Sequence, residues 1–122
     1  MINICPYCQQ KAQLVNGKEI YPHRPDLYSL KFWLCRPCDA YVGTHKNSLI
    51  HKPLGVLANL ELRKAKTNLH RIFDPIWKYG NMDRKEAYQW LSKKLGINES
   101  NCHIGMFDLS TCKRAEKIIR YR

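Results

Sequence analysis

The chain has 122 residues, of which 44% are hydrophobic, and it carries a formal net charge of +11. No stretch approaches the 18 apolar residues that a membrane-spanning helix needs, so we expect no spanning segment and no membrane as a partner. The length predicts one domain, or a small zinc module fused to a helical one. The strong positive charge favours nucleic acid as a partner, with an acidic protein surface as the second choice.

Two cysteine pairs, each with two residues between its members, stand in the first third of the chain: Cys5/Cys8 and Cys35/Cys38. A Cys-x-x-Cys turn places two thiolates on one side of a tetrahedral zinc ion, so two such turns complete a closed site. Because the start, MINICPYC, lacks the basic and apolar segments of a secretory signal, we expect a reducing cytoplasm rather than a disulfide scaffold. The four cysteines therefore predict one structural Zn²⁺, with a redox dithiol or an iron site as alternatives.

The segments around these cysteines predict short antiparallel strands. Residues 12–21 contain Asn16-Gly17, the strongest short signal for a hairpin turn, between apolar pairs. Residues 30–35 predict a further strand that delivers Cys35, and residues 40–43 predict a short last strand. This order of Cys-x-x-Cys turn, hairpin, strand and second Cys-x-x-Cys turn is typical of a zinc ribbon.

The rest of the chain predicts helices. Apolar residues recur at helical spacing from 58 to 73, after which Asp74 and Pro75 resemble the cap and first residue of a new helix. Residues 83–86 (DRKE) have the spacing of a capping box, with Asp83 as cap and Glu86 reaching back to it. They predict the start of a helix that ends at Gly96. A last helix is expected after Asp108.

We therefore expect an α+β fold in which an N-terminal four-cysteine zinc ribbon packs on a C-terminal bundle of three to four helices. Residues 1–55 form the ribbon and its connector, and residues 56–122 form a basic helical region, together one compact unit. Outward-facing cations of two helices are the candidates for contact with nucleic-acid phosphates. They are Arg63, Lys64, Lys66, Lys113, Arg114, Lys117 and Arg120.

Several short motifs, above all CRPCDAYVG at 35–43 and HIGMFD at 103–108, resemble those of a zinc-finger-containing family of unknown function from bacteriophages and bacteria. The likeness covers nearly the whole chain. Members usually carry glycine after each cysteine pair, where Gln9 and Asp39 stand here. The resemblance implies zinc binding and a phage or bacterial setting, with the bacterial host cytoplasm as the location. It implies no activity.

A more specific hypothesis is that the chain is a metal-dependent His-metal finger nuclease. In such an enzyme a histidine acts as general base beside a hydrolytic metal. Its candidates are His51 and His70. The Asp-His pair expected before the proline is missing, and both cysteine pairs precede the histidines. Neither a P-loop, a dinucleotide fingerprint nor a serine-hydrolase elbow is present, so we expect no organic cofactor.

The sequence thus favours a small, zinc-stabilised, non-enzymatic protein that binds DNA or RNA and is related to phages. The alternative is a phage-type inhibitor that docks on an acidic host protein such as a polymerase or nuclease. Two questions on metal binding stay open at this point. The first is whether His45 joins the zinc site, and the second is whether a separate metal corner forms from Cys102, His103 and Cys112.

Overall fold

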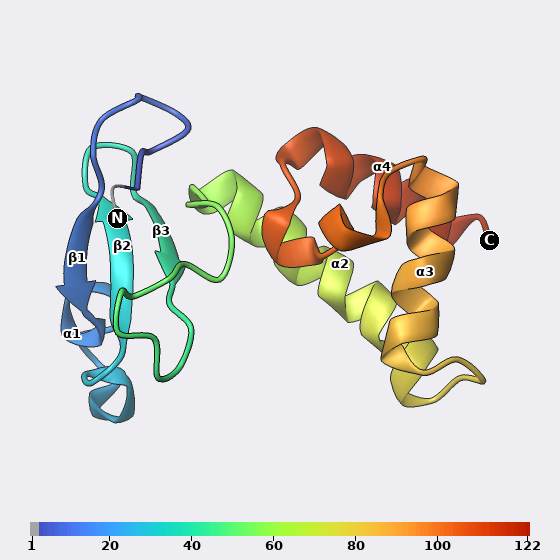
Figure 1. The fold of residues 1–122 in the computed structure, drawn as a ribbon, viewed down its shortest axis with the longest axis horizontal. Coiled ribbons are helices and arrows are strands. Elements are labelled where there is room, and N and C mark those ends of the chain that lie inside the picture. Colours follow the sequence, from blue (N-terminus) through green and yellow to red (C-terminus); the bar gives the residue numbers. More distant parts are fainter. Residues whose placement is uncertain (1–2) are drawn as a thin grey trace. The chain divides into compact units, whose positions relative to one another are not determined.

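The computed structural model describes residues 3–122, which form two compact units divided in sequence between Leu60 and Glu61 (Figure 1). The first unit carries a three-stranded sheet and the four paired cysteines, and the second is helical. This confirms the α+β fold class with a zinc ribbon followed by a helical part.

Within residues 3–122, none of the helices has both the length and the apolar character needed to cross a membrane.

The sheet of the first unit consists of β1 (Gln13–Asn16), β2 (Lys31–Cys35) and β3 (Ala40–Gly43). The strands are antiparallel in the order β1-β2-β3, so β2 is central and pairs with both of the others. Trp33 of β2 lies opposite Leu14 on one side and Val42 on the other. Side chains alternate between faces along β2, and Phe32 points away from Trp33, into an edge-to-face aromatic cluster with Tyr21.

The predicted hairpin over residues 12–21 is wrong. Gly17 begins a single helical turn, α1 (Gly17–Ile20), and β1 pairs with β2 instead of with residues 18–21. Position 17 requires glycine because another part of the backbone approaches it closely, and not because it forms a tight turn. A Cβ there would lie 1.7 Å from the carbonyl oxygen of Leu27, beside the short 3₁₀ turn η1 (Pro25–Leu27), and the Gly17 amide donates to the Leu30 carbonyl at 2.8 Å.

Residues 43–56, which the sequence predicts to be a polar connector, and the next two residues fold back along β3. Thr44 forms an isolated bridge with Pro53, and Tyr41 forms another with Ala58. Leu57 and Ala58 are buried, so this segment is part of the first unit's core.

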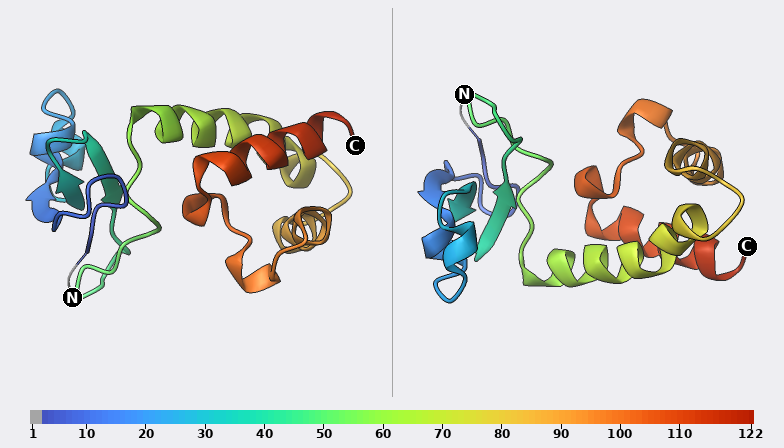
Figure 2. Two further views of the ribbon diagram at one scale, coloured as in Figure 1. Left: turned by 90° about the horizontal axis from the view of Figure 1, so that it is seen from above. Right: turned by 90° about the horizontal axis from the view of Figure 1, so that it is seen from below.

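The second unit is built from α2 (Leu60–Lys78), α3 (Arg84–Leu95) and α4 (Leu109–Arg120), with two 3₁₀ turns, η2 (Glu99–Asn101) and η3 (Ile104–Met106), between the last two. Figure 2 shows α3 end-on while α2 and α4 run lengthwise, so α3 crosses the other two helices. The largest fully buried side chains of this unit are those of Leu69, Phe73, Leu91, Cys102, Ile104 and Cys112.

The expected restart of the chain at Asp74-Pro75 is also wrong, because α2 continues through both residues to Lys78. Proline removes one backbone donor from a helix interior, but Pro75 is exposed and the helix tolerates it. Asp74 is not a cap: its Oδ1 lies 3.2 Å from His70 Nδ1 and accepts a hydrogen bond from Trp77 Nε1 at 3.3 Å.

The remaining helix ends follow the sequence signals. Asp83 and Glu86 form a full capping box at the start of α3, and Gly96 ends that helix in the left-handed region with φ 72°. Asp108 caps α4 by accepting from the Thr111 amide at 2.8 Å. Each cap satisfies backbone groups that a helix terminus leaves without partners.

Candidate metal centre and basic helices

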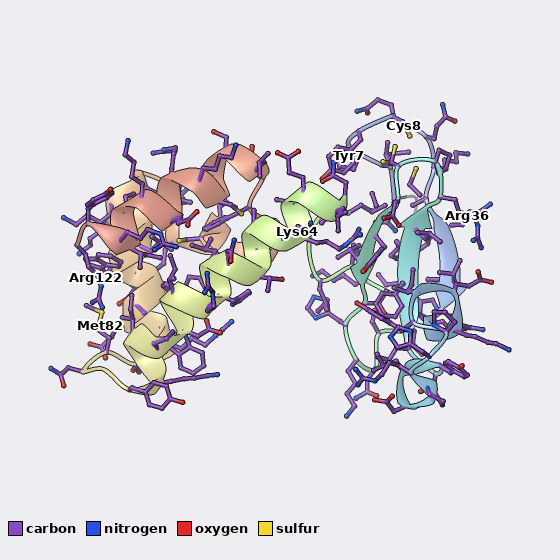
Figure 3. All side chains as sticks on the ribbon, turned by 180° about the vertical axis from the view of Figure 1, so that it is seen from behind. Tyr7, Cys8, Arg36, Lys64, Met82 and Arg122 are labelled. Carbon is purple, nitrogen blue, oxygen red and sulfur yellow. The ribbon has the colours of Figure 1, made fainter. Side chains whose placement is uncertain are left out.

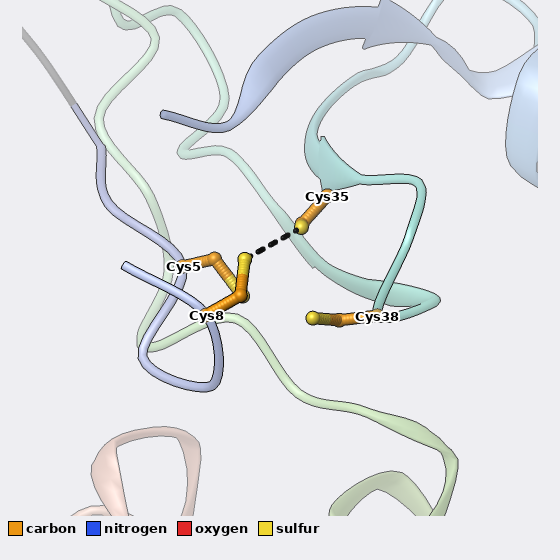
Figure 4. A group of neighbouring side chains, drawn as sticks. All are labelled: Cys5, Cys8, Cys35 and Cys38. Atoms are coloured by element: carbon orange, nitrogen blue, oxygen red, sulfur yellow. Dashed lines mark hydrogen bonds between the residues drawn. The ribbon is translucent and has the colours of Figure 1, made fainter. Parts of the chain in front are cut away.

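The two cysteine pairs meet in the first unit, as Figure 4 shows, with one pair on the turn before β1 and the other on the turn between β2 and β3. All four sulfur atoms lie within 4.8 Å of one another, and the Cys8 and Cys35 sulfurs are 3.6 Å apart. A tetrahedral zinc ion with Zn–S bonds of about 2.3 Å requires sulfur separations of about 3.8 Å. The four thiols therefore fit one zinc ion and leave no open coordination position for a substrate.

The centre is part of the hydrophobic core of its unit. Cys5 and Cys35 are buried together with Ala40 and Leu57, and Trp33 packs against this cluster. A unit of this size buries little apolar surface, so a metal cross-link between its two turns supplies stability that packing alone lacks.

Burial and the hydrogen bonds around the thiols shift the pKa values of three of the four cysteines. The Cys8 thiol, together with burial, raises the pKa of Cys38 to about 12. Burial raises the pKa of Cys35 as well. The pKa of Cys8 is lowered, chiefly by a hydrogen bond from the Gln10 backbone. Zinc binding therefore has to displace protons from Cys35 and Cys38, whose thiols hold them more tightly than a free cysteine does.

Each cysteine turn ends in a left-handed residue that is not glycine. Gln9 has φ 64° and Asp39 has φ 48°. The Gln9 amide donates to the Cys5 carbonyl at 2.9 Å, and the Asp39 amide donates to the Arg36 carbonyl at 3.1 Å. The left-handed conformation is what closes both turns, and it costs about 1 kcal/mol for a residue with a Cβ.

We expect Gln9→Gly to stabilise the zinc-loaded first unit by about 0.5–1 kcal/mol, because glycine adopts this conformation without strain. Urea unfolding monitored by zinc release to a chromogenic chelator measures the change. Gln10→Gly is the matched control: Gln10 is exposed and has no positive φ, so glycine there should lower stability. A destabilised Gln9→Gly protein would show that the left-handed strain is not relieved.

Four sulfurs on two knuckles at the base of an antiparallel sheet define a zinc finger of the ribbon type. The chain belongs to a zinc-finger-containing domain family, whose sequence model matches residues 1–122. Neither the curated proteins nor the solved structures gave a match.

The basic candidates of α4 are all exposed, on the side opposite the buried Cys112, Ala115 and Ile119. Arg114 also donates to the Leu95 carbonyl at 2.8 Å, which satisfies the end of α3, and Arg120 pairs with Glu116 at 3.0 Å. Lys113 and Lys117 are one turn apart, and neither side chain makes a hydrogen bond or ion pair within residues 3–122. These two lysines are therefore the cations of α4 available to a ligand.

The three candidates of α2 differ from one another in exposure. Lys64, labelled in Figure 3, is exposed, whereas Arg63 is half-buried. Lys66 is half-buried and donates to the Gly105 carbonyl at 2.7 Å, and burial lowers its pKa. Lys66 thus ties α2 to η3 and is a poor candidate for a phosphate contact, whereas the exposed Lys64 is still a candidate.

The two histidines of the nuclease hypothesis belong to different units. His51 lies in the loop after β3, where its carbonyl accepts from Trp33 Nε1 at 2.7 Å. His70 lies on α2 beside Asp74.

Within the described residues, only the cysteine tetrad brings together three or more groups able to hold a metal. His45 is not among them. Cys102 and Cys112 are buried in the second unit, and burial raises the pKa of each thiol to about 11. Both are core residues rather than the corner of a second metal site.

Proposed function

We propose that the protein is a non-enzymatic nucleic-acid-binding protein of phage-related origin, in which zinc holds the first unit together and α4 contacts phosphates. The observation that carries this proposal is the pair Lys113 and Lys117, exposed on one face of α4 with no acidic partner in the described chain. Lysines at this spacing lie on neighbouring turns of one helix face. Arg114 and Arg120 flank them and keep part of their hydrogen-bonding capacity.

The overall charge supports the same proposal. A net charge of +11 on 122 residues far exceeds what solubility needs, and it attracts polyanions at long range. Lysines at such a surface neutralise phosphates without reading bases, so we expect binding with little sequence preference and a strong dependence on salt.

The test is to measure affinity for labelled DNA and RNA over a range of salt concentrations for the wild type and for Lys113→Ala/Lys117→Ala. We expect the slope of log K against log salt to become shallower by about two units, with weaker binding to every sequence. Lys11→Ala/Lys85→Ala is the matched control, since both lysines are exposed and lie away from α4, Lys11 before β1 and Lys85 on α3. Equal losses in the two double variants would mean that total charge, and not the α4 face, determines binding.

Two other results would replace the proposal. Binding to an acidic host protein but not to nucleic acid would favour the inhibitor. Cleavage with added Mg²⁺ or Mn²⁺ that is lost in His51→Ala or His70→Ala would favour the nuclease.

A further inference from the structure

A second candidate binding surface lies in the first unit, between the sheet and the loop formed by residues 44–54. Backbone hydrogen bonds hold this loop: the His45 amide donates to Lys52 at 2.8 Å, and the Leu54 amide donates to Gly43 at 2.9 Å. The Trp33 indole holds the second half of the loop by donating a hydrogen bond to the His51 carbonyl at 2.7 Å. Because the loop is braced at both ends, the space beside it is a preformed feature of the fold.

That space is a pocket of about 580 Å³. Its apolar wall comes from Leu30, Phe32 and Leu54. At the tip of the loop Leu49 is 96% exposed, so further apolar surface without a partner in the described chain stands next to the pocket. A concave site of this size with an apolar wall is typical of small-molecule recognition.

The polar part of the pocket is basic or neutral. Its polar lining includes Lys31, His45, Lys46, Ser48 and His51, and none of the lining residues is an aspartate or glutamate. Lys46 is exposed, and its ammonium is not paired within residues 3–122. An anionic ligand therefore meets hydrogen-bond donors and two lysine ammonium groups, that of Lys46 and that of Lys31, which also donates to Asn16 Oδ1, with no carboxylate to repel it.

An apolar wall beside a cationic, acid-free rim matches a nucleotide, whose base is flat and partly apolar and whose phosphate is anionic. Two residues of the loop also hold left-handed conformations, Asn47 with φ 66° and His51 with φ 53°, a strain that is often found where a backbone is shaped for a ligand. From these features we infer that the pocket receives one unpaired nucleotide of a single strand, with the base against Phe32 and Leu54 and a phosphate at Lys46 and His45. In a duplex the base is stacked and paired, so it does not enter.

This inference rests on the proposed function and adds a preference for single strands. The experiment compares a labelled oligodeoxythymidylate with a duplex of the same number of phosphates, using the zinc-loaded full chain. His45→Ala/Lys46→Ala removes the rim of the pocket. His23→Ala/Lys52→Ala removes the same residue types from exposed positions that do not line it.

A second variant fills the pocket. A Cβ at Gly43 would lie 3.3 Å from Leu54 Cδ1 and 3.6 Å from Phe32 Cε1, so Gly43→Leu places a side chain against the apolar wall. We expect the rim and filling variants each to bind the single strand about tenfold more weakly and the duplex as before, while the control matches the wild type. We also expect thymidine 5′-monophosphate to shift the Trp33 indole N–H resonance, because that group is bonded to the wall of the pocket.

An unchanged single-strand affinity in the folded rim variant would overturn the inference, and so would equal losses for both nucleic acids. Either result leaves the proposed function standing if Lys113→Ala/Lys117→Ala still weakens binding. If the wild type binds no nucleic acid, both the proposed function and this inference are wrong. If Gly43→Leu does not retain zinc, it is misfolded, and the rim variant and the shift of the Trp33 resonance then test the inference.

Discussion

Cys35→Ser should abolish stoichiometric zinc binding and unfold the first unit while the helices of the second unit persist. Zinc binding supplies about 10–16 kcal/mol in comparable four-ligand sites, which exceeds what the small core around Cys5 and Leu57 provides by itself. Native mass spectrometry gives the zinc content, and amide hydrogen exchange reports each unit separately. Chelation of zinc from the wild type should give the same pattern.

Cys102→Ala is the control for this prediction, because Cys102 is a buried thiol in the core of the second unit. It should lower the stability of that unit and leave one zinc per chain. Protection of the β2 amides in a zinc-free Cys35→Ser protein would contradict the account, since the sheet would then be stable without its metal.

Gly17→Ala should destabilise the zinc-loaded first unit by more than about 3 kcal/mol, because the added Cβ overlaps the backbone carbonyl of Leu27 and no rotamer change relieves it. Urea unfolding with zinc release as the signal measures the loss. Gly43→Ala is the matched control: the nearest atom to its Cβ is the movable end of the Leu54 side chain at 3.3 Å, so the cost should be much smaller. Similar losses for the two variants would show that the close approach at Gly17 is not a constraint on the fold.

The cysteine spacing and the helix caps carried enough information to predict the metal tetrad, strands β2 and β3, and the ends of α3. Each cysteine pair and each cap consists of residues close together in sequence, such as Cys35 and Cys38 or Asp83 and Glu86, and the preference of zinc for four thiolates joins the two pairs. Local chemistry determines them, so a single sequence is sufficient.

The errors arose where tertiary contacts override a local signal. Asn16-Gly17 is typical of a hairpin turn, but here the glycine admits the carbonyl of Leu27, a residue ten positions later in the chain. Pro75 usually starts a helix, but contacts of buried Phe73 and Ile76 keep α2 continuous around it. The pocket beside residues 44–54 was missed because it depends on that loop folding back along β3, which no motif predicts.

The central proposal is that this zinc-finger protein binds nucleic acid through phosphate contacts. Its most direct test is the equilibrium affinity of the zinc-loaded wild type for single-stranded and duplex DNA and RNA, measured from low to physiological salt with Mg²⁺ present and checked on a denaturing gel. We predict intact nucleic acid and an affinity that falls steeply and linearly on a log–log plot. No binding at physiological salt, or binding that does not change with salt, would contradict the claim.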